Sequence, residues 1–200
     1  MRETESAVQI ILASSSKYKR QLIEKLGISI VCTSPDIDES PRDGETPVAL
    51  AERLSIAKAR ALAATHPDHL IIGSDQVAHV EGQLLGKPGN HRQATAQLLA
   101  CRGKTVEFLT GLCLLNSLTG DYQYHCSPIQ VRFRPLTEGQ IENYLQREQP
   151  YDCAGSFRSE GLGIALFESI HGDDPNALIG LPLIELTRML FSQGIDVLAV

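Results

Sequence analysis

Near the start of the chain, an apolar run is followed by three serines and then by a helical pattern. Residues 8–13 read Val-Gln-Ile-Ile-Leu-Ala, which favours a buried strand, and residues 14–16 are all serine. From Lys17 to Leu26 the apolar residues take helical spacing. A strand that passes directly into a helix is typical of α/β folds, and the free N–H groups and positive end of such a helix attract anions. The sequence therefore predicts an α/β sheet with an anion site at its first turn.

Helix-like and strand-like segments alternate along the rest of the chain. We expect helices at residues 47–65, 92–100 and 181–193, a helix capped by Thr137 that runs through Arg147, strands at residues 69–73, 105–115 and 122–133, and a loop at residues 152–163. The last two strands form an antiparallel hairpin, because a turn-rich segment joins them. The pattern predicts a mixed, twisted sheet flanked by helices, with a cleft between two lobes. No repeat or long linker interrupts it, so residues 1–200 are expected to form a single domain.

Composition narrows the classes of partner. A net charge of -6 and a pI near 5.5 argue against a nucleic-acid-binding or membrane-binding surface, which is normally rich in Lys and Arg. The five cysteines are scattered and never form C-x-x-C, so we expect neither a disulfide framework nor a zinc site. The chain shows no secretory signal and no run near the roughly 20 apolar residues of a membrane span. We expect a cytoplasmic protein.

Two acidic segments are candidates for chemistry. Asp75 follows the predicted strand 69–73, and ligand-binding residues of open α/β sheets gather at strand ends. The loop at residues 35–41 offers a second carboxylate, and two carboxylates together could hold a hard cation such as Mg²⁺. Each segment also has a simpler interpretation, since an Asp after a strand is often a turn-former and an acidic loop is often only solvated.

Two lysines are weaker candidates for an anion site. Lys87 stands between Gly86 and Pro88, which restrict the backbone around it, and Lys58 lies on the polar face of the helix at residues 47–65. Taken alone, each is better interpreted as an ordinary surface lysine.

Several common nucleotide and hydrolase signatures are missing. The chain has no G-x-x-x-x-G-K-[ST] run, so a P-loop kinase or ATPase is not expected. Gly161 and Gly163 do not extend to a dinucleotide fingerprint, because Leu166 stands where the third glycine would be needed. Ser159 lacks the preceding glycine of a nucleophile elbow. The six histidines are scattered without i, i+4 pairing, so each is interpreted as a surface residue rather than a metal ligand.

A series of motifs in a fixed order resembles the Maf family of nucleoside triphosphate pyrophosphatases. The motifs are at residues 10–14, 73–77, 86–88, 155–163 and 178–182. The resemblance implies hydrolysis of a nucleoside triphosphate between its α- and β-phosphates, assisted by a divalent cation, Mg²⁺ or Mn²⁺. It also implies a mixed α/β fold of the Maf/ITPase type with a cleft between two lobes, often as a homodimer.

The resemblance assigns roles to individual residues. Asp75 is the general base that takes a proton from the attacking water, and Glu39 and Asp75 hold the metal. The groups that clamp the triphosphate are Ser14, Arg20, Lys58 and Lys87. Lys19 stands where many members have Arg, so it keeps the charge but lacks the bidentate fork of a guanidinium.

Three positions resemble the subfamily that acts on 7-methyl-GTP, namely Tyr18, Gln76 and Glu160. An aromatic ring can stack on the positively charged 7-methylguanine, and Glu160 can accept hydrogen bonds from its N1–H and 2-amino groups. Pyrimidine-specific relatives tend to have Arg, Thr and Gln at these positions. The expected function is therefore a 7-methyl-GTP pyrophosphatase that removes a non-standard nucleotide. The alternatives are a dTTP/UTP pyrophosphatase of the same family and a non-catalytic, nucleotide-binding regulator of cell division.

Overall fold

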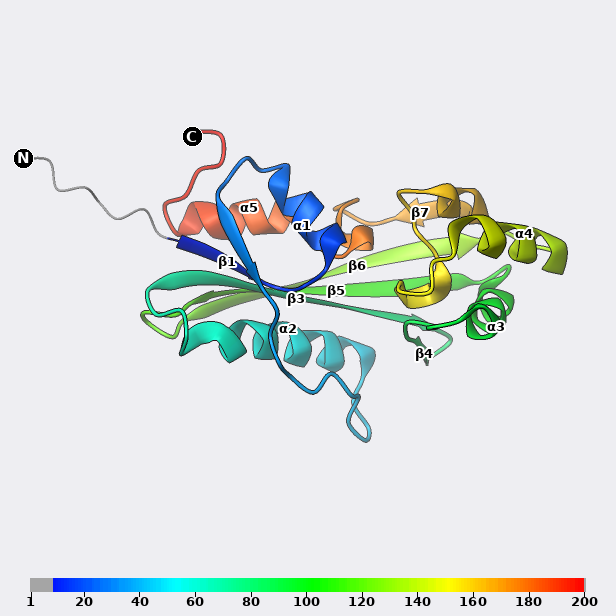
Figure 1. Cartoon of the computed structure of the whole chain (residues 1–200), viewed down its shortest axis with the longest axis horizontal. Helices are drawn as coiled ribbons and strands as arrows, with labels where there is room; N and C mark the ends of the chain where they lie inside the picture. The colour runs from blue at the N-terminus through cyan, green and yellow to red at the C-terminus, as the bar shows by residue number, and fades with distance from the viewer. Residues whose placement is uncertain (1–8, 200) are drawn as a thin grey trace, which may run out of the picture.

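One long sheet runs through the computed structural model, which describes residues 9–199 (Figure 1). Its strands are β1 (Gln9–Ala13), β2 (Ile30–Thr33), β3 (His69–Val80), β4 (Gln83–Leu85), β5 (Thr105–Asn116), β6 (Tyr122–Phe133) and β7 (Phe167–His171). The order is β2-β1-β3-β5-β6-β7, and the short β4 pairs with β3. β1 runs parallel to β2 and β3, whereas the other pairs are antiparallel, so the predicted mixed sheet is confirmed.

Side-chain caps fix where most of the helices begin. The helices are α1 (Lys17–Glu24), α2 (Pro47–Ala63), α3 (His91–Cys101), α4 (Glu138–Glu148) and α5 (Leu183–Ser192). The caps of the first four are Ser16, Thr46, Asn90 and Thr137, and each side chain accepts a hydrogen bond from a backbone N–H of the first turn. Over residues 9–199, no helix has the length and apolar character needed to cross a membrane.

The sheet is shared by two lobes. β3, β5 and β6 each have 12 residues, roughly 40 Å of extended chain, and they pass from one lobe into the other. In the first lobe, α1 and α5 cover one face of the sheet and α2 covers the opposite face (Figure 1). In the second lobe, the same strands pack with β4, β7, α3 and α4 around buried aromatic residues such as Phe108 and Phe133.

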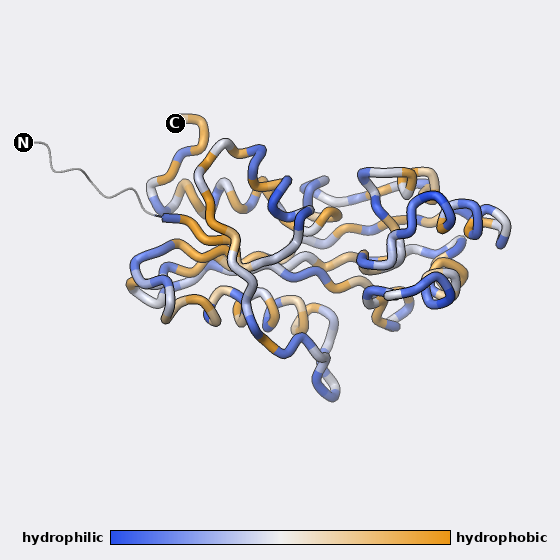
Figure 2. The backbone as a smooth tube through the Cα atoms, in the orientation of Figure 1, coloured by the Kyte–Doolittle hydropathy of each residue, from blue (hydrophilic) through white to orange (hydrophobic). Residues whose placement is uncertain are grey.

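Hydropathy follows this arrangement. Figure 2 shows hydrophobic residues along β1, whose last four residues are buried, and hydrophilic residues in the loop between β2 and α2. The strand directions and the separate hydrophobic cores confirm the prediction of two lobes on a mixed α/β sheet.

One predicted strand end was wrong, and two strands were not predicted. β3 does not stop at Gly73 but continues to Val80, so Asp75 lies within the strand and pairs with Gly111 of β5. The strand continues because neighbouring elements satisfy its polar side chains, as described below. β2 and β7 are edge strands of only four and five residues, and none of these residues is buried, so each is too short and too exposed to be identified as a buried strand.

Candidate functional site

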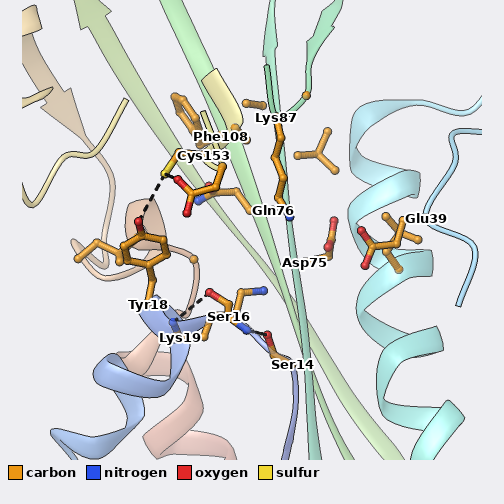
Figure 3. Close-up of a pocket in the computed structure, with 18 of the residues that line it drawn as sticks. Ser14, Ser16, Tyr18, Lys19, Glu39, Asp75, Gln76, Lys87, Phe108 and Cys153 are labelled. Carbon is orange, nitrogen blue, oxygen red and sulfur yellow. Dashed lines mark hydrogen bonds between the residues drawn. The ribbon is translucent and has the colours of Figure 1, made fainter. Parts of the chain in front are cut away.

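A cavity of about 700 Å³ lies between the lobes, beside the middle of β3. On one edge of β3, pairing with β1 extends to Ile72, and pairing with β4 begins at Ala78. Within residues 9–199, the five residues between them have no strand beside them on that edge. They are the predicted motif at residues 73–77, and the cavity occupies the gap (Figure 3).

Successive side chains of a strand point to opposite faces of the sheet, so the side chains of residues 73–77 alternate between the two faces. Asp75 points toward α2, where its Oδ1 accepts a hydrogen bond from Lys58. Ser74 and Gln76 point to the other face, where the Ser74 hydroxyl donates to the Gly180 carbonyl at 3.0 Å. An acidic group and an amide thus enter one cavity from opposite faces of the sheet.

Two glycines let α2 approach the sheet closely enough to reach Asp75. A Cβ atom at Gly73 would lie within 2.1 Å of the Ser55 carbonyl oxygen, and one at Gly111 would lie 2.4 Å from the Ser55 hydroxyl. Ser55 is fully buried, and its hydroxyl accepts a hydrogen bond from the Asp75 N–H at 3.1 Å. Lys58, one turn further along α2, is therefore held against Asp75.

The ammonium group of Lys58 lies between two carboxylates. Its Nζ is 2.5 Å from Asp75 Oδ1 and 2.7 Å from Glu39 Oε1. Burial disfavours the charged lysine, but the two carboxylates outweigh it and raise the pKa of Lys58. Burial likewise opposes ionisation of Glu39, but the hydrogen bond from Lys58 lowers the pKa of Glu39. Both carboxylates are therefore aimed at one point that favours positive charge.

This pair of carboxylates fits a divalent cation that arrives with phosphate. Within the described residues, no group of three or more His, Cys, Asp or Glu side chains is placed to hold a metal ion. Mg²⁺ is usually bound by one or two carboxylates, and waters and substrate phosphates supply the other ligands. Glu39 and Asp75 are the residues that could supply such a partial set of oxygen ligands (Figure 3).

Further cations line the same part of the cavity. Lys19 is buried, and its ammonium group donates to the Ser74 carbonyl at 2.5 Å. Burial lowers the pKa of Lys19 from 10.5 to about 8, although nearby Asp75 opposes that shift. Lys87 extends from the loop after β4 toward Asp75, and Ser14 lies on the side of α1 (Figure 3).

Arg20 is the one predicted site residue that does not line this cavity. Its guanidinium donates to Glu24 at 3.0 Å, and both side chains are more than half exposed. Lys19 instead occupies the inner face of α1 together with Leu22 and Ile23. The spacing of three and four residues from Lys19 to these buried side chains is the sequence signal that separates it from Arg20.

Tyr18, Gln76 and Glu160 also line the cavity, and Figure 3 shows Tyr18 on the other side of it from Asp75 and Glu39. The Tyr18 ring lies near two cations, with Lys17 Nζ at 4.9 Å and Arg158 Cζ at 5.9 Å from its centroid. Burial raises the pKa of Tyr18, so its hydroxyl remains neutral.

Backbone acceptors orient the amide of Gln76. Its Nε2 donates to the carbonyls of Ala177 and Leu178 at 2.9 and 3.0 Å, and also to Thr110 Oγ1 at 3.0 Å. Because these contacts occupy the amino group, the carbonyl oxygen of Gln76 is left as an acceptor. The exposed residue Glu160, which also lines the cavity, offers a carboxylate as a second acceptor.

Comparison with known proteins gives consistent matches over nearly the whole chain. Residues 9–193 match the sequence profile of the family described as Maf-like protein. A protein of Nitrosococcus oceani is 56% identical over 94% of this chain and 95% of its own length. A protein of Pseudomonas savastanoi pv. phaseolicola is 55% identical over 94% and 98%, and one of Alcanivorax borkumensis is 54% identical over 96% and 98%. Each of the three is named 7-methyl-GTP pyrophosphatase.

Proposed function

The chain belongs to the Maf family, and from that membership we propose that it hydrolyses 7-methyl-GTP to 7-methyl-GMP and pyrophosphate. The names of the three relatives support this substrate. The observation that carries the proposal is a single cavity lined by cations, paired carboxylates, an aromatic ring and two further acceptors, with Tyr18 on the other side of it from Asp75 and Glu39 (Figure 3). A nucleotide needs both ends, since its triphosphate and its base are recognised by different chemistry.

Asp75 is the proposed general base. Lys58 holds one of its carboxylate oxygens, which leaves the other to accept a proton from a water molecule that attacks the α-phosphate. Lys58 also fixes the direction of the carboxylate, because the buried Ser55 hydroxyl holds the backbone of Asp75 at the same point. A divalent cation, Mg²⁺ or Mn²⁺, held by Glu39 and Asp75, would lower the pKa of that water and offset phosphate charge.

Several cations are needed at the phosphate end. A triphosphate carries about four negative charges. Each pair of opposite unit charges 4 Å apart contributes about 4 kcal/mol of attraction at an effective dielectric constant near 20. The proposed clamp consists of Lys19, Lys58, Lys87 and the hydroxyl of Ser14, which all line the cavity. The N-terminus of α1 adds a positive helix end beside Ser14.

The base end suits a methylated guanine. Methylation at N7 gives the base a positive charge, which favours stacking on the Tyr18 ring. The carbonyl oxygen of Gln76 and the carboxylate of Glu160 would accept from the N1–H and the 2-amino group. Uracil and thymine present one N–H between two carbonyls, so they match two acceptors poorly.

The family resemblance also supports a homodimer that acts in the cytoplasm. Sedimentation equilibrium of the purified chain tests the dimer directly, and cell fractionation tests the location.

The direct test is pyrophosphate release from 7-methyl-GTP, GTP, dTTP, UTP and ATP, with and without Mg²⁺ or Mn²⁺. We expect metal-dependent turnover that is greatest with 7-methyl-GTP. Glu160→Gln should reduce kcat/KM for 7-methyl-GTP by roughly tenfold or more and change that for UTP little, because each hydrogen bond to a charged group contributes about 1.5–3 kcal/mol. Equal losses for both nucleotides would contradict the base pocket.

Asp75→Asn separates catalysis from binding. It keeps the size of the side chain but removes the proton acceptor, so kcat should fall by about 10²–10⁴-fold while 7-methyl-GTP still binds. A wild-type protein that binds nucleotide and releases no pyrophosphate would instead favour a nucleotide-sensing role, and a preference for dTTP or UTP would favour a pyrimidine enzyme.

A further inference from the structure

The side chain of Gln97 on α3 joins two loops that line the cavity. Its Nε2 donates to the Gly86 carbonyl at 3.0 Å, and its Oε1 accepts from the Ser156 hydroxyl at 2.6 Å. One planar amide therefore serves one loop as a donor and the other as an acceptor. Among side chains, only Asn and Gln offer both functions in a neutral amide, and Gln has the longer reach.

The two loops carry opposite ends of the proposed nucleotide site. Gly86 immediately precedes Lys87, which belongs to the triphosphate end, and both line the cavity. Ser156 lies between Cys153, whose thiol donates to the Tyr18 hydroxyl at 3.9 Å, and Glu160, the proposed acceptor for the base, and both of these residues line the cavity. The link through Gln97 is therefore a direct connection between phosphate recognition and base recognition.

The geometry of Ser156 depends on this link. Ser156 is fully buried and has a φ of 64°, a left-handed conformation that costs a residue with a Cβ roughly 1 kcal/mol or more. The preceding Gly155 also has a positive φ, of 74°. Such a turn persists only where its surroundings hold it, and the short hydrogen bond to Gln97 is the side-chain contact that anchors Ser156.

A second connection joins the same two segments further along the chain. The N–H of Gly89 donates to the Tyr151 carbonyl at 2.9 Å, and His91 Nδ1 lies 3.0 Å from the Tyr151 hydroxyl. The two segments are thus joined at two points, so a change at Gln97 is expected to alter their spacing rather than unfold them.

We propose that Gln97 is a positioning residue that sets the separation between Lys87 and Glu160, so that the two ends of a nucleotide bind as one unit. The proposal rests on the proposed function, because it requires a ligand that spans both ends. Two binding groups on a rigid frame act together with a high effective concentration, and loosening the frame lowers the affinity for the spanning ligand far more than for a ligand of either end. Gln97 itself touches neither the reacting atoms nor, in this scheme, the nucleotide.

The test compares a spanning ligand with ligands of one end. Gln97→Met removes both hydrogen bonds at similar side-chain volume, whereas Gln97→Glu keeps the acceptor for Ser156 and loses the donor for Gly86. The control is Gln93→Met, one turn earlier on an exposed part of α3, where the structure from residue 9 to residue 199 shows no side-chain hydrogen bond. All three are made in the Asp75→Asn background, so that dissociation constants can be measured by calorimetry without turnover.

We expect both Gln97 variants to weaken 7-methyl-GTP binding about tenfold and to change the affinities for inorganic tripolyphosphate and 7-methylguanosine by less than about twofold. The Gln93 variant should match its parent. Hydrogen exchange in the ligand-free protein should rise at residues 86–89 in both Gln97 variants, and at residues 154–158 most strongly in Gln97→Met.

Three results would overturn the proposal. Unchanged affinity for 7-methyl-GTP in Gln97→Met would show that the hydrogen bonds of Gln97 do not set the separation between Lys87 and Glu160. An equal loss for tripolyphosphate would reduce Gln97 to a local support of the phosphate end. A parent protein that binds 7-methyl-GTP no more tightly than tripolyphosphate would refute the proposed base site and the coupling with it, and that failure is seen before any Gln97 variant is made.

Discussion

Lys19 is a buried cation whose charge depends on pH near the physiological range. Burial lowers its pKa to about 8 from the ordinary 10.5, so the group is an ammonium below that pH and a neutral amine above it. We therefore expect the affinity for inorganic tripolyphosphate to fall as pH rises through about 8. Calorimetry between about pH 7 and about pH 9.5 measures this loss.

Lys19→Arg is the matched variant for this prediction. A guanidinium stays charged over the whole range, so the affinity of Lys19→Arg for tripolyphosphate should change little with pH.

The lowered pKa of Lys19 also has a consequence for stability, because the unfolded chain binds the proton more tightly than the folded one. The Lys19 contribution to the free energy of unfolding should thus rise between about pH 8 and pH 10.5, where the unfolded chain holds more protons. If the affinity for tripolyphosphate changed with pH in the same way in the wild type and in Lys19→Arg, Lys19 would not belong to the phosphate clamp.

The close packing of helix α2 against the sheet positions Lys58. Gly111 on β5 leaves no room for a side chain, since a Cβ there would lie 2.7 Å from the Ala51 carbonyl oxygen. Gly111→Ala should push α2 outward and cost about 1–3 kcal/mol of unfolding free energy. Because that shift separates Lys58 from Asp75, kcat should fall by a larger factor than stability alone explains. Thermal unfolding and pyrophosphate release measure the two effects.

Gly139→Ala on α4 is the control for this substitution. A Cβ at Gly139 meets no atom within 4 Å, and alanine favours a helix by about 0.5–1 kcal/mol over glycine. This variant should be slightly more stable and as active as the wild type. If Gly111→Ala were equally active, the approach of α2 would have no part in the site.

The elements that were predicted from sequence are those with strong local signals. The capping residue Thr137 and the hairpin of β5 and β6 follow from short-range chemistry that one segment carries by itself. β3 was predicted too short because Ser74 and Asp75 interrupt its apolar run. Their partners come from α2 and from the segment around Gly180, which no local pattern reveals.

The site was predicted through its motifs, and the unpredicted parts are those set by tertiary contacts. Asp75, Gln76 and Lys87 lie in recognisable segments, and all three line the cavity. Gln97 gives no signal, because a glutamine on a helix surface is ordinary until both of its loops are placed. The family resemblance assigns Arg20 to the phosphate clamp, although the buried face of α1 belongs to Lys19.

For the whole molecule, the shared strands determine how the lobes unfold. β3 and β5 contribute buried residues to the hydrophobic cores of both lobes, so neither core can open without breaking strands of the other. The cavity between the lobes is therefore formed on a continuous sheet rather than at a hinge between separate units. This arrangement favours a site of fixed geometry, which suits two recognition ends that must hold one ligand.

A pair of matched core substitutions tests this coupling. Ile71→Val removes a methylene from the core of the first lobe, and Ile129→Val does the same in the second, where both side chains are fully buried. Each should cost about 0.5–1.5 kcal/mol and shift one common unfolding transition. Hydrogen exchange of residues 70–72 and 78–80, at the two ends of β3, should then report the same unfolding free energy in each variant. If each substitution instead increased exchange only in its own lobe, the lobes would unfold separately, and the shared sheet would not hold the site rigid.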